Sequence, residues 1–258
     1  MAVPKIYKDF YEQKVFTLGD VKNRYKGRNT PGSLNLLIHN SKAHGYIGSV
    51  KKGLYYTIPH GFSVEDYKAD KYLIASRLSP AAVIAYHSAL EFHGVAQSVF
   101  NQVFVLTRAR MANLDFQGTQ FTGVIGHLNF GCMNLMREGV AIRVTDRERT
   151  LVDCIDRLRY AGGLEEYFKS AEGFPSINFQ RIEEYLKRYK KINLYAKVGF
   201  LLTLFEKKWS FPADVRRRMR NKIRKKVYYL DHEKKENVLN KEWNLMIPEN
   251  LREIIFSV

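Results

Sequence analysis

The sequence predicts an α+β protein, with an N-terminal winged helix-turn-helix followed by a larger α/β C-terminal domain. Its 258 residues, 45% of them apolar, exceed one average domain and can build two packed cores. A pattern of three short helices and a hairpin fills the first 60 residues. Strand candidates followed by several amphipathic helices fill most of the remainder. We therefore expect a first domain at 1–60, a linker helix at 61–78 and a second domain at 79–258.

The chain is strongly basic, and two segments concentrate the positive charge. Lys and Arg total 42 against 26 Asp and Glu, which gives a formal net charge of +16. One cluster consists of Lys22, Arg24, Lys26 and Arg28, and the other spans 207–226, where ten basic residues accompany a single acid. This balance favours a phosphate-bearing partner, although an acidic substrate or an anionic membrane is also compatible with it. Two separate clusters indicate two surfaces with different tasks.

The sequence contains no signal for membrane insertion or export. Its longest apolar stretch, at 198–205, is far shorter than the roughly 20 residues of a transmembrane helix. The N-terminal residues lack the apolar core and cleavage site of a signal peptide. Cys132 and Cys154 have no metal-ligand spacing. We therefore expect a cytoplasmic protein with two free thiols and with no metal ion, no cofactor and no membrane partner.

The first domain begins with three short helix candidates, at residues 6–13, 18–25 and 31–44. Thr17 is suited to cap the second helix, with Asp20 as an acid in its first turn. Asn29 or Thr30 is suited to cap the third helix, which has Pro31 at its first position. The apolar spacing of the third helix predicts that one of its faces packs into a core.

The opposite face of the third helix and the hairpin after it are both suited to DNA. This face carries Ser33, Asn35, His39, Asn40 and Lys42, mostly short hydrogen-bonding side chains of the kind that pair with base edges in a major groove. Strand candidates at 46–50 and 54–58 are joined by Lys51-Lys52-Gly53, where glycine permits a tight turn. A hairpin with a basic tip after a third helix is typical of a winged helix.

The predicted DNA-binding residues come from the third helix, its N-terminal approach and the hairpin tip. We expect the lysines of the tip to contact phosphate or to reach the minor groove. The full set is Arg28, Asn29, Thr30, Ser33, Asn35, His39, Lys42, Lys51 and Lys52. Two alternatives stay open, because three-helix units with hairpins also serve as protein-docking modules and a basic cluster is often only a solvated face.

The second domain combines strand candidates with helices. A short charged helix at 64–77 leads into it, and Ser79 and Pro80 predict the start of an apolar helix that ends near residue 92. Thr145 or Asp146 is suited to cap a helix that continues through Leu158. The strand candidates lie at 102–107, 116–122, 124–130 and 140–144, and the later helix candidates lie at 164–172, 179–189 and 194–207.

The second domain offers no convincing catalytic constellation. His87, Glu91 and His93 are close in sequence, but His93 falls on a different helix face from the other two, which argues against a metal site. The interleaved carboxylates and arginines of 146–159 lack the arrangement of a nuclease motif, and ion pairs between helix turns account for them. We therefore expect no catalytic residues and no enzyme.

The second basic cluster predicts a surface helix after Pro212. At helical spacing, Val215, Met219 and Ile223 are left to pack. A solvated charged helix usually mixes signs and this one does not, so we expect a contact with a polyanion or an acidic protein, with the solvated face as the alternative. The predicted contact residues are Arg216, Arg217, Arg218, Arg220, Lys222, Arg224, Lys225 and Lys226.

Four segments of the chain resemble segments of a known family, and they occur in the same order as in that family. They are 46–55, which forms the hairpin; Ser79-Pro80 with the segment 88–94; 143–153, which contains Asp146-Arg147-Glu148-Arg149-Thr150; and 161–166, which reads Ala-Gly-Gly-Leu-Glu-Glu. With these segments, residues from about 5 to about 225 resemble the AbiEi family of abortive-infection regulators, the antitoxins of type IV toxin–antitoxin systems.

The resemblance implies a winged helix that binds inverted repeats in its own promoter, and a C-terminal domain responsible for antitoxicity. It also implies a nucleotidyltransferase toxin as the cognate partner, countered directly or indirectly, so the cluster at 216–226 becomes a candidate toxin contact. We therefore expect a transcriptional autorepressor and antitoxin that binds double-stranded operator DNA, compatible with a monomer that binds the repeats cooperatively. The alternatives are a nucleic-acid-processing enzyme targeted by the winged helix, and a general transcription regulator without a toxin.

Overall fold

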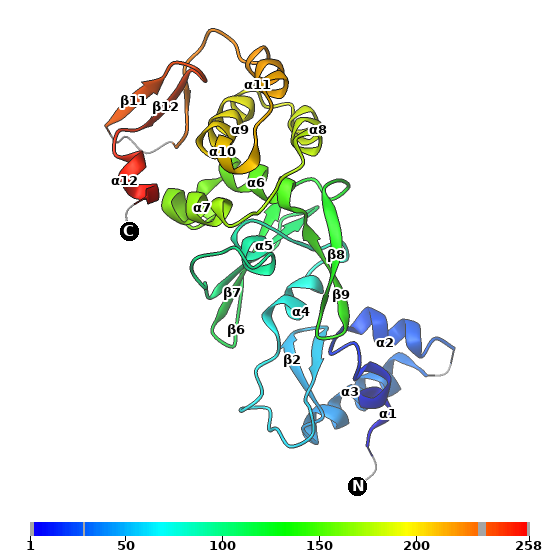
Figure 1. Cartoon of the computed structure of the whole chain (residues 1–258). Coiled ribbons are helices and arrows are strands. Elements are labelled where there is room, and N and C mark those ends of the chain that lie inside the picture. The colour runs from blue at the N-terminus through cyan, green and yellow to red at the C-terminus, as the bar shows by residue number, and fades with distance from the viewer. Residues whose placement is uncertain (1–2, 28, 232–235, 257–258) are drawn as a thin grey trace. The chain divides into compact units, whose positions relative to one another are not determined.

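The computed structural model describes residues 3–27, 29–231 and 236–256, and the chain divides into two compact units (Figure 1). Unit 1 comprises Met1–Ile84, Asn101–Leu128 and Asn134–Arg143, and unit 2 comprises Ala85–Phe100, Asn129–Met133 and Val144–Val258. Both units contain helices and strands, so the α+β class is confirmed. The units are discontinuous in sequence, and the domain boundaries expected at residues 60 and 78 stay a prediction. Within the described ranges, every helix is too short or too polar to cross a bilayer.

The N-terminal part of unit 1 contains three helices and a small antiparallel sheet. Its elements are α1 (Lys5–Phe10), β1 (Val15–Thr17), α2 (Leu18–Arg24), α3 (Pro31–Ala43), β2 (Ile47–Lys51) and β3 (Leu54–Thr57), with β3 between β1 and β2. Thr17 and Asp20 form a reciprocal capping box at the start of α2, and Thr30 caps α3 ahead of Pro31, both as predicted. Strand β1 is an addition to the predicted elements, because three residues are too few for a periodic signal.

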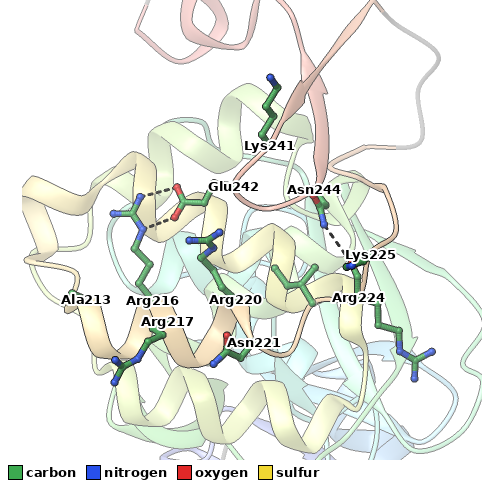
Figure 2. A pocket seen from close by; sticks show the side chains of 11 residues that line it. Ala213, Arg216, Arg217, Arg220, Asn221, Arg224, Lys225, Lys241, Glu242 and Asn244 are labelled. Carbon is green, nitrogen blue, oxygen red and sulfur yellow. Dashed lines mark hydrogen bonds and ion pairs between the residues drawn. The ribbon is translucent and has the colours of Figure 1, made fainter.

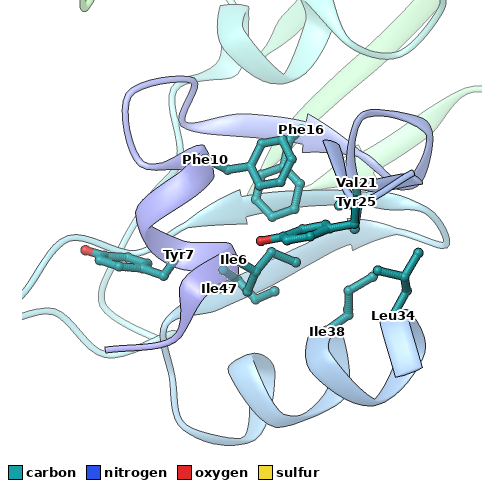
Figure 3. Close-up of a cluster of buried hydrophobic side chains, with 9 residues drawn as sticks. All are labelled: Ile6, Tyr7, Phe10, Phe16, Val21, Tyr25, Leu34, Ile38 and Ile47. Atoms are coloured by element: carbon teal, nitrogen blue, oxygen red, sulfur yellow. The ribbon is translucent and has the colours of Figure 1, made fainter. Parts of the chain in front are cut away.

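A buried apolar cluster joins these helices to the sheet (Figure 3). The rings of Phe10 and Phe16 stack at 4.4 Å between centroids, and α3 contributes Leu34 and Ile38 from the face predicted to pack. The other buried members are Ile6, Tyr7, Val21, Tyr25 and Ile47. The segment between α1 and α3 is therefore held by a core of its own, and the orientation of α3 follows from it.

One carboxylate on α1 fastens α2 to this core. The hydroxyl of Tyr25 donates to Asp9 at 2.7 Å, and the guanidinium of Arg24 donates to the same carboxylate at 3.2 Å. The hydrogen bond from Tyr25, reinforced by Arg24, lowers the pKa of Asp9 below its ordinary value.

The remainder of unit 1 is built on a larger sheet. Its strands are β4 (Val83–Ile84), β5 (Gln102–Thr107), β6 (Leu114–Phe116), β7 (Thr119–Ile125), β8 (Cys132–Arg137) and β9 (Val140–Thr145), in the order β6-β7-β5-β4-β9-β8. The chain passes between the two units within β8 and within β9. Tyr56 of β3 contacts Phe116 of β6 edge to face at 5.8 Å, so the small sheet packs against the larger one within unit 1.

The predictions of a helix at 64–77 and of a helix from Pro80 to near residue 92 are wrong in their bounds. In place of a helix over 64–77 the structure has α4 (Lys71–Ser76), because the carboxylate of Asp70 accepts the backbone N–H groups of Tyr72 and Leu73 and starts the helix there. The helix predicted from Pro80 is replaced by β4 and a short helix α5 (His87–Phe92). The pairing of β4 with β5 buries 83–84 between strands, which outweighs the local helix signal at Ser79.

The predicted strands of unit 1 are correct in part. The segments 102–107 and 140–144 are strands. The candidate at 116–122 is divided between β6 and β7, and the candidate at 124–130 is wrong beyond Ile125, where β7 ends. Gly123 continues β7 because it pairs with Val105, and a Cβ there would lie 2.7 Å from the Cβ of Met111. Glycine here marks a close approach and not a strand end.

Unit 2 is a helical body with a small terminal sheet. Its later elements are α6 (Arg147–Asp156), the 3₁₀ turn η1 (Leu158–Tyr160), α7 (Gly163–Glu172), α8 (Phe179–Tyr189), α9 (Ile192–Leu204), α10 (Glu206–Trp209), α11 (Ala213–Arg220), β10 (Tyr228–Tyr229), β11 (Asn237–Asn240), β12 (Leu245–Pro248) and α12 (Leu251–Phe256). Trp243 is fully buried and donates its indole N–H to Thr203 at 3.0 Å, and Gly199 leaves space for its ring. The terminal sheet is thereby fixed to α9.

We predict that Gly48→Ala destabilises unit 1 by about 1–3 kcal/mol, the usual cost of overpacking a core. A Cβ at Gly48 would lie 2.1 Å from the buried ring of Tyr56. Urea unfolding followed by far-UV circular dichroism measures the loss. Tryptophan fluorescence should not change, because Trp209 and Trp243 both belong to unit 2.

The matched control is Gly32→Ala in α3, where nothing lies within 4 Å of the added Cβ. Alanine in a helix should keep or raise the stability, by up to about 1 kcal/mol. Equal losses in the two variants would show that the contact with Tyr56 does not limit position 48.

Candidate nucleic-acid interface

The exposed face of α3 is mainly polar. Asn35, His39 and Lys42 are exposed, as predicted, while Leu34 and Ile38 point into the core. Leu36 lies among the polar residues and is 60% exposed, although the sequence analysis did not include it as a site residue. Because an apolar side chain of this kind can contact a thymine methyl group, it fits a base-reading face.

Three predicted site residues at the start of α3 bind one another. The amide of Ser33 donates to Oγ1 of Thr30 at 3.3 Å, its hydroxyl donates to the Thr30 carbonyl at 2.8 Å, and Asn29 donates to the Ser33 hydroxyl at 3.3 Å. Their polar groups are therefore occupied in part by capping the helix. The prediction for Arg28 lies outside the described residues.

Asn40 lies apart from the other polar residues of α3. It lines a small pocket together with Pro4, Lys5 and His44, so it faces α1. The exposed polar face of α3 is therefore narrower than the predicted one. It consists of Asn35, His39 and Lys42 together with Leu36.

The hairpin tip presents two cations beside the start of α2. Lys51 and Lys52 are exposed, and among the described residues neither makes an ion pair. Gly53 has φ +81° and accepts the backbone N–H of Leu18 at 2.8 Å, which attaches the tip to the N-terminus of α2. A pocket of about 520 Å³ between these elements is also lined by Arg77. Arg77 adds a cation near the tip that sequence reasoning missed, since it lies far along the chain.

The first basic cluster is only partly free for a ligand. Arg24 is bound to Asp9, whereas Lys22 and Lys26 are exposed and make no ion pair within the described part of the chain. Within the described part of unit 1, the cations without an ion pair therefore include the two lysines of the tip and Lys22 and Lys26 of the α2 region.

The second basic cluster differs from the predicted helix. Helix α11 ends at Arg220, and the residues from Asn221 to Lys226 continue as turns and irregular chain. Ile223 is therefore only partly buried, whereas Val215 and Met219 are buried as predicted. The hydrogen bond from the Ile223 N–H to the Arg220 carbonyl replaces the helical pattern there.

Two of the eight predicted contact residues are neutralised inside unit 2. Arg216 makes a bidentate pair with Glu242, at 2.5 and 2.7 Å, and also contacts Glu206 at 3.1 Å. Arg218 binds Glu183 at 2.8 Å and Asp214 at 2.5 Å. These arginines hold α11 against α8, α10 and the loop at Glu242, because a bidentate pair fixes the orientation of the arginine side chain relative to its carboxylate.

The other six predicted contact residues are exposed and make no ion pair with any described residue. They are Arg217, Arg220, Lys222, Arg224, Lys225 and Lys226. A pocket of about 540 Å³ beside α11 brings several of them together with Lys241, which sequence reasoning missed because it lies in a different segment (Figure 2). Figure 2 shows Arg216 and Arg220 pointing toward Glu242, while Arg217 and Arg224 extend outward.

The histidines considered for a metal site have structural partners. His87 is fully buried between two carboxylates, with Nδ1 3.2 Å from Glu91 and Nε2 3.1 Å from Glu166. His93 contacts the Thr145 carbonyl through Nε2 at 2.8 Å, and burial lowers the pKa of its imidazole. Across the described residues, no group of three or more His, Cys, Asp or Glu side chains is placed to hold a metal ion.

The motif residues at 146–153 also form an internal network. The hydroxyl of Tyr185 donates to Asp146 at 2.5 Å, and Tyr189 donates to Asp153. These two tyrosines tie α8 to α6 and its cap. Arg149 is 1% exposed and donates to Asp153 at 3.3 Å and to the Phe130 carbonyl, so it ties α6 to the chain before it. Burial raises the pKa of Asp153, opposed by Arg149 and Tyr189. Asp146, Arg149 and Asp153 are therefore held by partners inside the protein.

The comparisons with known proteins show a shared fold and do not bear on function. No family model matches the chain, and neither does any curated protein. Among solved structures, the chain is similar to the crystal structure of the RV2827C protein from Mycobacterium tuberculosis, with a TM-score of 0.63 and 14% sequence identity over 97% of this chain and 92% of that chain. A similarity at this identity establishes a shared fold, which extends over nearly the whole of both chains.

We predict that Glu166→Gln destabilises unit 2 by about 1–3 kcal/mol at neutral pH, because a buried charged acceptor is lost. Glu166 accepts the N–H groups of Gln97 and Ser98 at 2.9 and 3.2 Å and the hydroxyl of Ser170 at 3.1 Å. Burial acts to raise its pKa, but the hydrogen bonds from Ser98, His87 and Gln97 outweigh burial, so the pKa is lowered. Urea unfolding followed by tryptophan fluorescence measures the difference.

The pH dependence of that difference has a definite sign. Because the folded state lowers the pKa of Glu166, its contribution is complete above the ordinary pKa of a glutamate and is lost as the pH falls through the folded-state value. The difference in the free energy of unfolding between wild type and Glu166→Gln should therefore become smaller as the pH falls into the acid range. The control Glu165→Gln changes an exposed partner of Lys169 and should cost less than about 0.5 kcal/mol. Equal effects at 165 and 166 would contradict the buried network.

Proposed function

We propose that the protein is a DNA-binding transcriptional regulator whose N-terminal segment acts as a winged helix. The observation that carries this proposal is the joint exposure of Asn35, His39 and Lys42 on α3 and of Lys51 and Lys52 at the adjoining hairpin tip. All five side chains are presented by elements that one buried core fixes. A protein-docking module has no need of this combination of base-pairing side chains and unpaired cations.

The roles of the two surfaces follow from their chemistry. Helix α3 lies in the major groove, where the amide of Asn35 pairs with an adenine edge and Leu36 contacts a thymine methyl group. The exposed face of α3 carries a single full charge, at Lys42, so it contributes selectivity more than affinity. Lys51 and Lys52 bind the phosphate backbone and contribute binding free energy that does not depend on the base sequence. Arg77 and Lys22 extend this phosphate contact.

We further propose that the protein is the antitoxin and autorepressor of a type IV toxin–antitoxin system. The support is the resemblance of its hairpin, its Asp-Arg-Glu-Arg-Thr segment and its Ala-Gly-Gly-Leu-Glu-Glu segment to the AbiEi family. On this proposal the protein acts in the cytoplasm, binds inverted repeats upstream of its own gene, and counters a nucleotidyltransferase toxin encoded beside it. The unpaired residues of the 216–226 cluster are the candidate contact for that toxin or for a polyanion.

An enzymatic function is the less favoured alternative. The carboxylates and histidines that the sequence places close together, among them His87 and Asp153, are buried and bound to one another. A metal-dependent nuclease assay with duplex and single-stranded substrates tests this alternative, and cleavage would bring it forward.

Two experiments test the proposal itself. A band-shift titration with the DNA upstream of its own gene should give saturable binding that random DNA of equal length does not compete away. Co-expression with the neighbouring gene separates an antitoxin from a general regulator, because only an antitoxin restores growth. The absence of a preference for the upstream DNA would refute the autorepressor.

We predict that Lys51→Ala/Lys52→Ala weakens binding to operator and random DNA alike. Loss of one or two phosphate contacts should reduce the slope of log K against log salt by about 1–2. Band shifts over a salt series measure the slope. The control Lys8→Ala/Lys68→Ala removes two exposed lysines of unit 1 away from the tip and should leave the slope unchanged. An unchanged slope in the tip variant would exclude the hairpin from the DNA contact.

We predict the opposite pattern for the polar face of α3. Asn35→Ala or His39→Ala should cost about 1–3 kcal/mol of operator binding and much less on random DNA, because a base contact is lost. The control is Asn40→Ala on the same helix, since Asn40 faces α1. If the operator and random DNA lose affinity equally, α3 does not read the bases.

A further inference from the structure

The second basic cluster forms two adjoining pockets in unit 2. The first is the pocket of about 540 Å³ beside α11, and the second has about 450 Å³ and lies beside β10. Arg224 lines both, so its side chain is a wall that the two pockets share. We name the two pockets together the α11–β10 groove.

The charge of this groove is almost wholly positive. Six cationic side chains line the first pocket and three line the second, with Arg224 counted in both. The single carboxylate among the lining residues, that of Glu242, is held by Arg216 at 2.5 Å. Figure 2 shows the cations spread along the wall, since Arg217 and Arg224 extend away from the pair at Glu242. Spaced cations of this kind fit a chain of phosphates better than one compact anion.

The second pocket adds an exposed aromatic ring. Tyr229 is 51% exposed and lies beside Lys190 and Lys226, both exposed cations. Its neighbour Tyr228 is 7% exposed and accepts the backbone N–H of Arg224 at 3.4 Å, so it holds the loop while Tyr229 faces outward. The asparagine side chains of 193, 221 and 244 also line the groove and can bind base edges.

We propose that the α11–β10 groove binds single-stranded nucleic acid, with the phosphates along the cations and a base stacked on Tyr229. An aromatic ring next to a basic groove is the usual device for single strands, because an unpaired base offers its flat face. A duplex keeps its bases stacked inside and leaves the ring without a partner. An acidic protein would pair with the cations but would make no use of the ring. This site is independent of the DNA contact proposed for unit 1.

The experiment uses the full chain and fluorescence anisotropy. The probes are a labelled RNA of about 12 nucleotides, within the site sizes of single-strand-binding grooves, the single-stranded DNA of the same sequence, and the corresponding duplex. We expect the single strands to bind, and the ratio of RNA to DNA affinity identifies which of the two the groove prefers. All probes are also measured in the Lys51→Ala/Lys52→Ala background, so that the hairpin tip of the proposed operator contact does not contribute to the binding that the groove variants change.

Tyr229 supplies the decisive variants. Tyr229→Ala should weaken single-strand binding by about 5- to 150-fold, the effect of removing one stacked ring. Tyr229→Phe should retain the affinity, because it keeps the ring. Circular dichroism checks that both variants fold. Equal affinity of the Ala and Phe variants would overturn the stacking role and the proposal with it.

The cations are tested by salt dependence. Arg220→Ala/Arg224→Ala should lower the slope of log K against log salt by about 1.4, since each phosphate contact on a single strand contributes about 0.7. The matched control Arg108→Ala/Arg110→Ala removes two exposed arginines of unit 1 and should change nothing. Absence of single-strand binding, an equal loss of duplex and single-strand affinity in Tyr229→Ala, or displacement of the RNA by polyglutamate as readily as by unlabelled RNA would each overturn the proposal.

Discussion

The allocation of carboxylates decides which cations of this protein remain available to a ligand. There are 42 Lys and Arg for 26 Asp and Glu, so many cations have no acidic partner. Asp9 binds Arg24, Glu242 binds Arg216, and Glu183 binds Arg218. Each of these pairs fastens one element to another. Among the cations without an ion pair in the described residues are Lys51 and Lys52 at the hairpin tip and six residues of the 216–226 cluster, and the two proposed ligand surfaces are built on these.

The proposed DNA surface depends on a core that contributes no DNA contact. Leu34 and Ile38 fix one face of α3, so that Asn35 and His39 face outward, and the bond from Leu18 to Gly53 sets the hairpin tip beside α2. Because tightly packed interiors transmit strain, substitutions in this core should displace the polar face and the tip together. On the proposed function, affinity and selectivity for DNA would rest on the same buried contacts.

Within unit 2, the residues on which the proposed AbiEi resemblance rests are largely buried. Arg149 and Asp153 bind each other and the chain around them, and Glu166 accepts hydrogen bonds from a loop and from α7 while it contacts His87. Such residues specify how the helices of unit 2 meet, and they are not presented to a partner. In unit 2 these segments thus bear on the architecture, whereas the segment at 46–55 of unit 1 also presents the exposed Lys51 and Lys52.

The sequence by itself determined the elements whose signals are local. The cap at Thr17, the hairpin around Gly53 and the helix over 179–189 were predicted correctly, because capping and turn formation need only neighbouring residues. For two further caps the sequence left two candidates each, Asn29 or Thr30 and Thr145 or Asp146, and the structure selects Thr30 and Asp146. Tertiary structure alone decided the rest. Strand β4 exists because β5 pairs with it, and α11 stops at Arg220 where the chain turns toward β10. It also decided that Arg216 and Arg218 are neutralised while Lys241 joins the groove, because an ion pair depends on distance in space and not on spacing along the chain.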